Sequence, residues 1–294
     1  MINASEINFT VDELDQIPCG APCVGIGRTI WGHFDAVSFL NKAGPGPLRE
    51  FFFENDILTV HTQEQVNFVV RIPCSLLTKS DSKTKMLVQY GHGLFGDRKE
   101  LLDGYLGDMA EKYQWIMFAT DWAGMSKFDL LSAFRVFAFH AEEFYTIPNR
   151  LTQGFLFNAI TLRMMRLQFS SDPSMLSCNG TKLILPEKTP FAYYGNSMGS
   201  IVGGGYLAYS VDHTIGVLGV PGSPFALILS RSKDFTFFDK ILKLQLWRQQ
   251  DVRLYISLFQ MLWDPSERFA FRCTGLDLLY TYTSYICLFV YMYI

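Results

Sequence analysis

The segment Tyr193-Tyr194-Gly195-Asn196-Ser197-Met198-Gly199-Ser200 decides the fold. It follows the apolar run Phe191–Tyr194 and leads into residues 200 to 210, which can form a helix. A strand, a sharp turn and a helix therefore follow one another. Glycines on both sides of Ser197 leave room for the tight turn that lifts a serine hydroxyl out of a sheet. This arrangement predicts a nucleophilic serine at position 197, whereas the five-residue pattern without its context would be a weak signal.

The helix after Ser197 supplies a second feature of the predicted site. The first N–H groups of a helix have no partner inside it, so the Met198 N–H is a candidate donor to the oxyanion of a tetrahedral intermediate. The triplet Gly203-Gly204-Gly205 costs this helix about 1 kcal/mol of propensity per glycine. We therefore expect the triplet to permit close packing of the helix against the sheet.

An upstream glycine-rich loop reads Tyr90-Gly91-His92-Gly93-Leu94-Phe95-Gly96-Asp97 and follows the apolar run Met86–Tyr90. It predicts a second oxyanion donor, the Leu94 N–H, with Gly93 as a substrate contact and His92 in a structural role. The same glycines also match a dinucleotide-binding fingerprint, with Asp121 ending the next strand. We prefer the oxyanion loop because it explains this motif and the Ser197 turn with one mechanism.

Short apolar runs and helical stretches alternate along the chain after residue 78. The runs Met86–Tyr90, Trp115–Thr120, Phe191–Tyr194 and Ile215–Val220 are typical of buried parallel strands, and Thr152–Phe169 has helical spacing. This alternation predicts an α/β fold with a mostly parallel sheet and helices on both faces. We expect a β-rich N-terminal segment (1–78), a catalytic core (79–272) and an atypical apolar, aromatic tail (273–294).

The two glycine motifs together resemble the lipase and esterase branch of the α/β-hydrolase superfamily, from about residue 55 to about residue 265. The resemblance implies a serine hydrolase that cleaves carboxylic esters through an acyl-enzyme, with a small-molecule or lipid ester as substrate and neither cofactor nor metal. Trp122 follows the strand ending at Thr120, so we expect it at the active-site edge of the sheet, lining the substrate pocket.

The acid and the histidine of this family follow the serine in the chain. Only His213 follows Ser197, and we expect it at the end of the sheet opposite the active site; Asp239 and Asp264 are candidate acids by order. The tail from Leu278 to Ile294 is uncharged, and we favour a truncated or misread gene end over a membrane anchor. The sequence therefore predicts an incomplete C-terminal part and a chain that lacks its base, so that the chain as given could be inactive. A non-catalytic binding protein of this fold and a membrane-associated protein remain as alternatives.

Composition limits the partners, metal sites and compartments that the sequence allows. The chain has 294 residues, is 49% hydrophobic and carries a formal net charge of -3, which gives no field that would attract nucleic acid. Cys19 and Cys23 lie close in sequence and predict a local disulfide or two thiols rather than a metal site. The N-terminus shows no signal peptide, so we expect either an intracellular protein, cytoplasmic by default, or a sequence whose true start is missing.

Overall fold

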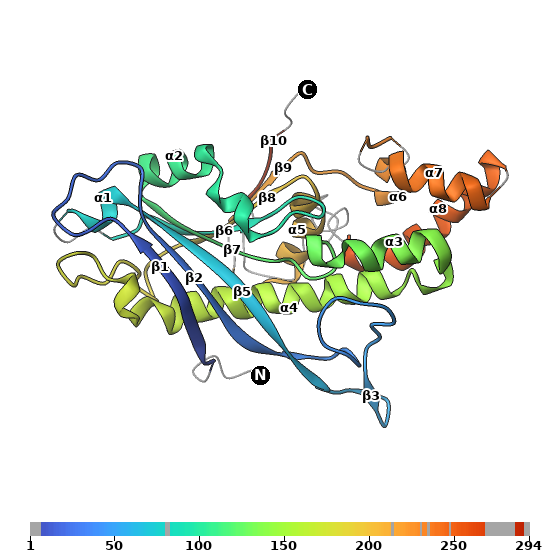
Figure 1. Cartoon of the computed structure of the whole chain (residues 1–294), viewed down its shortest axis with the longest axis horizontal. Coiled ribbons are helices and arrows are strands. Elements are labelled where there is room, and N and C mark those ends of the chain that lie inside the picture. The colour runs from blue at the N-terminus through green and yellow to red at the C-terminus, as the bar shows by residue number, and fades with distance from the viewer. Residues whose placement is uncertain are drawn as a thin grey trace.

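A central eight-stranded sheet organises the protein, for which a computed structural model describes residues 7–79, 83–212, 215–229, 231–233, 236–246, 248–267 and 286–290. The strands lie in the order β1-β2-β5-β7-β6-β8-β9-β10 (Figure 1). Their bounds are β1 (Phe9–Gln16), β2 (Ile26–Ser38), β5 (Thr62–Pro73), β6 (Met86–Gly91), β7 (Trp115–Thr120), β8 (Phe191–Asn196), β9 (Ile215–Gly219) and β10 (Ile286–Val290). The strands β3 (Phe53–Glu54) and β4 (Ile57–Leu58) pair separately.

The sheet has a parallel half and an antiparallel half. All neighbours from β7 through β6, β8 and β9 to β10 are parallel, whereas β1, β2 and β5 pair antiparallel and join the sheet at β7. The predicted mostly parallel sheet is confirmed, and its four apolar runs are β6, β7, β8 and β9. The strands of the N-terminal segment extend this same sheet, and the division at residues 78 and 272 stays a prediction.

Helices cover both faces of the sheet, as the apolar runs require. Along β6, Leu87 packs with helix α4 (Thr146–Leu167), whereas its neighbour Val88 packs with helix α2 (Gly104–Tyr113) on the opposite face. Helix α5 (Met198–Tyr209) lies on the α4 face, where Gly203 meets the Tyr193 ring: a Cβ at Gly203 would lie 2.4 Å from a ring carbon. The close packing expected from the glycine triplet is confirmed.

A group of helices lies at one end of the sheet, on the right in Figure 1. It comprises α3 (Leu130–Phe139), α6 (Phe225–Leu229), α7 (Thr236–Gln245) and α8 (Gln249–Trp263). Stacked aromatic rings hold it, with the centroids of Phe144 and Phe259 3.8 Å apart. The shorter helices are α1 (Cys74–Leu77), η2 (Arg98–Leu102), η3 (Lys127–Asp129), η4 (Ala141–Glu143), η5 (Phe169–Ser171), η6 (Pro173–Met175) and η7 (Asp264–Ser266).

The predicted tail, residues 273–294, lies mostly outside the described residues. Its described part, Ile286–Val290, is strand β10, which pairs in parallel with β9. Among the helices of the described ranges, none is both long enough and apolar enough to cross a bilayer.

Two disulfides correct the expectation for the cysteines. Cys19 pairs with Cys178 and Cys23 pairs with Cys74, each with Cα atoms 5.6 Å apart, so Cys19 and Cys23 are not joined to each other. The sequence separations are 159 and 51 residues, which is why local spacing did not reveal the partners. Disulfides persist mainly in oxidising compartments, so these pairs favour such a compartment over the cytoplasm expected by default.

Reduction of these disulfides is expected to lower stability strongly. Both close long loops, and removing a crosslink of this kind costs about 2–5 kcal/mol because the unfolded chain gains conformational freedom. We expect a lower midpoint of urea unfolding with reductant than without it. Alkylation of the native, unreduced protein should leave Cys19, Cys23, Cys74 and Cys178 unmodified in the mass spectrum. Alkylation at any of these four would contradict the pairing.

Candidate active site

Ser197 occupies the sharp turn between β8 and α5. Its backbone has φ 52° and ψ -121°, a conformation that a non-glycine residue rarely adopts and that costs about 1–3 kcal/mol. Such strain persists only where the surroundings impose it. At a strand-to-helix turn it projects the hydroxyl above the edge of the sheet.

Hydrogen bonds on both sides hold the turn. The Ser197 N–H donates to the Gly219 carbonyl at 2.9 Å, and the Ser197 carbonyl accepts from the Ser200 N–H at 2.9 Å and from the Ser200 hydroxyl at 2.7 Å. Beneath the turn, the Tyr193 hydroxyl donates to the Gly199 carbonyl at 2.6 Å. Burial raises the pKa of Tyr193 well above its ordinary value, so this donor keeps its proton.

Strand register brings the upstream loop beside the turn. Gly91 of β6 pairs with Gly195 of β8, so both segments leave the sheet at the same level. A Cβ placed on Gly93 would lie 3.8 Å from the Ser197 Cβ. Two glycine motifs that are about a hundred residues apart in the sequence therefore meet at one edge of a parallel sheet.

The first helical residue and the loop each present a backbone N–H that has no partner among the described residues. In the loop, the Gly93 N–H donates to the Glu100 carboxylate. The Phe95 N–H donates to the Met125 carbonyl, and the Gly96 N–H donates to the Gly93 carbonyl. The Leu94 N–H donates to no described residue, nor does the N–H of Met198 at the start of α5. These are the two donors that the sequence predicts.

Comparisons with known proteins found likenesses only among solved structures. No family model and no curated protein matches this sequence. Among solved structures, the chain is similar to an acetyl xylan esterase from Paenibacillus sp. R4, with 12% identity, a TM-score of 0.45, and coverage of 99% of this chain and 84% of that one. Acetyl xylan esterase 1 from Thermoanaerobacterium sp. JW/SL YS485 is 11% identical, with a TM-score of 0.44, and the match covers 88% of this chain and 76% of that one.

A carboxyl esterase from Bacillus coagulans is a more distant likeness, with 15% identity and a TM-score of 0.30, covering 60% of this chain and 47% of that one. The architecture itself decides the fold. A parallel β6-β8-β9 core, a strained serine after β8 and a helix that starts at the next residue define one fold family. The chain has the α/β-hydrolase fold.

His92 has a structural position in this fold. It is fully buried, its Nε2 accepts from the Trp122 N–H at 2.8 Å, and its Nδ1 lies 2.8 Å from the Gly93 carbonyl. One ring nitrogen accepts and the other donates, which describes a neutral imidazole with the proton on Nδ1. Both nitrogens are thereby occupied in linking the loop to the end of β7.

Glu100 is a neighbour of the loop that sequence reasoning missed. Its carboxylate accepts from the Gly93 N–H at 3.0 and 3.3 Å and from the Tyr90 hydroxyl at 3.3 Å. A Cβ on Gly96 would lie 1.8 Å from the Glu100 Oε1, so only glycine admits the carboxylate there. The glycine pattern of the loop gives no signal for an acid at position 100, and this contact was therefore visible only in three dimensions.

Trp122 lies in the core, with 1% of its surface exposed. Its ring meets Phe155, Tyr193 and Tyr206 edge to face, with centroids 5.6 to 6.1 Å apart across this aromatic group. Its backbone N–H holds His92. The predicted substrate contact of Trp122 stays a prediction, and the ring packing gives this residue a structural position.

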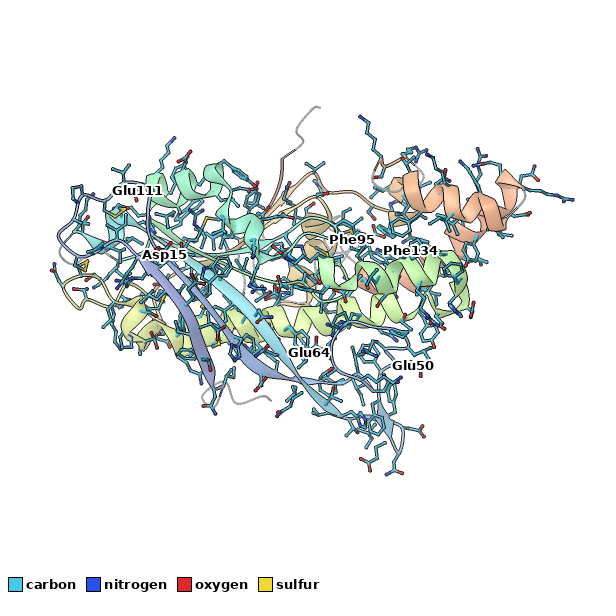
Figure 2. All side chains as sticks on the ribbon, viewed as in Figure 1. Asp15, Glu50, Glu64, Phe95, Glu111 and Phe134 are labelled. Carbon is cyan, nitrogen blue, oxygen red and sulfur yellow. A yellow bond between two sulfur atoms is a disulfide. The ribbon has the colours of Figure 1, made fainter. Side chains whose placement is uncertain are left out.

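The aromatic residue of the loop lies under the helices at the end of the sheet. Phe95 has a positive φ of 55°, and its ring packs 6.2 Å from the Phe238 ring of α7. Phe95 and Phe134 of α3 pack against the same core cluster (Figure 2). The Phe95 ring therefore connects the loop to α7.

The acid and base candidates do not meet Ser197 in the part of the chain that the structure describes. No described side chain hydrogen bonds to the Ser197 hydroxyl. Asp239 pairs with Lys243, and the Asp264 carboxylate accepts from Gln260 at 2.7 Å. His213 lies outside the described residues.

Potential metal ligands gather elsewhere. His140, Glu142 and Glu143 place ligand atoms within 4.8 Å of one another at the end of α3. The Glu143 carboxylate binds the Arg135 guanidinium with both oxygens, and Arg135 holds the pKa of Glu143 below its ordinary value. These contacts describe an ion-pair cluster at a helix end.

Proposed function

We propose that this protein is a serine hydrolase that cleaves small-molecule or lipid carboxylic esters through an acyl-enzyme. The observation that carries the proposal is the strained Ser197 turn with two amides beside it, Leu94 N–H and Met198 N–H, that have no partner among the described residues. Holding a serine in this conformation lowers the stability of the fold, and the hydrogen bonds around Ser197 keep the residue in that conformation.

In the proposed reaction the Ser197 Oγ attacks the acyl carbonyl carbon, and its proton passes to a general base. The described residues place no such base at the Ser197 hydroxyl, so the proposed step requires a histidine outside the described residues. The carbonyl oxygen becomes an oxyanion held by the Leu94 and Met198 amides, with each donor contributing about 3 kcal/mol to the transition state. The alcohol leaves with a proton and the acyl group stays on Oγ. Water then attacks the same carbon and releases the carboxylic acid.

A fluorophosphonate probe tests this proposal because it forms a covalent bond with an activated serine. Labelling of the folded protein at Ser197 would support it. Absence of labelling in a folded protein would instead favour the non-catalytic alternative.

Glu100 gives a second test, since it fixes the loop without belonging to the predicted donors. Glu100→Ala leaves the Gly93 N–H without its acceptor, at a cost of about 1–3 kcal/mol, and frees the loop to move. We expect kcat for p-nitrophenyl acetate to fall by about 10- to 100-fold with little change in KM, because the oxyanion forms only in the transition state. Glu100→Gln, which keeps an oxygen acceptor, should retain most of the activity.

Glu111→Ala is the matched control for this prediction. The Glu111 carboxylate also accepts a backbone N–H, from Ser75 at 3.1 Å, but it lies on α2 away from the loop. Equal losses of kcat in Glu100→Ala and Glu111→Ala would show that the effect is one of general stability.

A further inference from the structure

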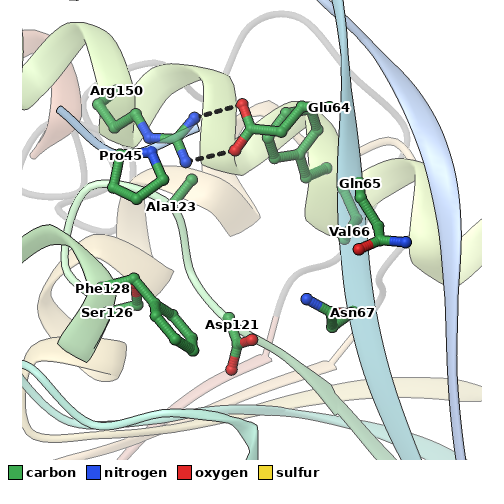
Figure 3. A pocket seen from close by; sticks show the side chains of 11 residues that line it. Pro45, Glu64, Gln65, Val66, Asn67, Asp121, Ala123, Ser126, Phe128 and Arg150 are labelled. Atoms are coloured by element: carbon green, nitrogen blue, oxygen red, sulfur yellow. Dashed lines mark hydrogen bonds and ion pairs between the residues drawn. The ribbon is translucent and has the colours of Figure 1, made fainter. Parts of the chain in front are cut away.

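A cavity opens at the same edge of the sheet as Ser197. It has a volume of about 210 Å³ and lies between the N-terminal part of β5, the segment that follows β7, and helix α4. Figure 3 shows Asn67 and Asp121 on one side of it and the Glu64–Arg150 pair at its far wall. This volume is below the range of about 300–1,000 Å³ that holds drug-sized ligands, so the cavity fits one small ring.

The charges that line this cavity are already paired. Arg150 binds Glu64 with both terminal nitrogens, and Arg98 binds Asp121. Arg150 also reaches Asp129 at 3.4 Å, behind the wall. Because each lining carboxylate has a guanidinium partner, the cavity offers no unpaired charge to a charged ligand. The ligand that it suits is neutral.

The same groups retain hydrogen-bonding capacity. A carboxylate has about four acceptor sites, and the two Asp121 oxygens accept only from the Arg98 backbone and side chain among the described residues. The half-buried Asn67 amide and the exposed Gln65 amide make no side-chain hydrogen bond to any described residue. Acceptors and amides of this kind match hydroxyl groups, which both donate and accept.

An aromatic ring completes the wall. Phe128 is 49% exposed and borders the cavity, with the Lys127 ammonium 5.1 Å from its ring centroid. The face of an aromatic ring carries partial negative charge and attracts weakly positive C–H groups. A saturated ring with hydroxyl groups at its rim and C–H groups on its faces could hydrogen bond to the polar side chains of the cavity and pack against the Phe128 ring.

The cavity lies within reach of an ester bound at Ser197. Asp121 directly follows β7, which is two strands from β8, and Asn67 lies on β5, which is three strands away. At about 4.8 Å between strands, these positions are roughly 10 and 14 Å from the nucleophile along the sheet edge. A substrate of two or three ring units spans such a distance.

We propose that this cavity binds a neutral, polyhydroxylated ring of about the size of one sugar unit. Its position assigns that ring to the alcohol side of an ester whose acyl group is at Ser197, and this second assignment rests on the proposed function.

Binding of small polyols to the full chain carrying Ser197→Ala tests the cavity separately from catalysis. The probes are methyl β-D-glucopyranoside and myo-inositol, with cyclohexanemethanol as the apolar comparison and glucose 6-phosphate as the charged one, all at millimolar concentration by saturation-transfer NMR. We expect at least one neutral polyol to bind and cyclohexanemethanol not to bind. Glucose 6-phosphate should bind no more tightly than the neutral polyol.

Asn67→Leu should weaken this binding about tenfold, the equivalent of one hydrogen bond. Gln63→Leu, a similar exchange on the same strand outside the cavity, should leave it unchanged. Phe128→Ala provides a second variant at an exposed position and should also weaken binding. Absence of polyol binding, or equal binding by the Asn67→Leu and Gln63→Leu proteins, would overturn the proposal. Polyol binding by a protein that no fluorophosphonate labels would keep the cavity and refute the esterase.

Discussion

Ser197→Ala is expected to abolish fluorophosphonate labelling and to reduce hydrolysis of p-nitrophenyl esters to background. The hydroxyl oxygen is the atom that bonds to the acyl carbon, and nothing else in the described turn can replace it. Loss of the serine nucleophile in a complete hydrolase lowers kcat on the order of 10⁶-fold. Labelling followed by mass spectrometry of the modified peptide measures the effect directly.

Ser257→Ala is the matched control for that experiment. Ser257 is an exposed serine on α8 whose hydroxyl donates to the Arg253 carbonyl at 2.9 Å, and it contacts no part of the turn. We expect this variant to label as the wild type does. Labelling that persists in Ser197→Ala would place the nucleophile elsewhere and refute the proposed role of the turn.

The parallel strands β6, β7 and β8 were predictable because their side chains are mostly buried on both faces of the sheet. Burial requires continuous apolar runs, and runs such as Trp115–Thr120 end at turns that the sequence also shows. The Ser197 turn was predictable for a related reason, since its glycines are needed by the backbone itself. In both cases neighbouring residues in the sequence were enough to indicate the structure that they form.

Contacts between distant segments were not predictable in the same way. The Cys19–Cys178 pair depends on how the whole chain is folded, and the Glu100 carboxylate meets Gly93 only because η2 turns back on the loop. The packing of the Trp122 ring is another contact of this kind. Trp122 follows the end of β7, as the sequence indicates, and its ring lies in the core because the Tyr193 and Tyr206 rings pack around it.

Gly199→Ala is expected to cause the second large loss, because it acts on the contact between the two glycine motifs. A Cβ at position 199 would lie 2.2 Å from the Gly91 carbonyl oxygen and 2.6 Å from the His92 carbonyl oxygen. These are backbone atoms and cannot rotate away, so the loop must move from the turn. Overpacking of this kind costs about 1–3 kcal/mol or more. A shift of about 1 Å in a catalytic group lowers rates about 100-fold.

We therefore expect Gly199→Ala to lower both the midpoint of urea unfolding and the rate of fluorophosphonate labelling. Gly104→Ala is the control, since no atom lies within 4 Å of a Cβ there and alanine favours the α2 helix. That variant should label at the wild-type rate and be at least as stable. If Gly199→Ala unfolds as the wild type does yet labels slowly, the loss lies in the spacing between the loop and the turn. Wild-type labelling by Gly199→Ala would contradict the oxyanion role of the loop, because the Leu94 amide would then have moved without effect.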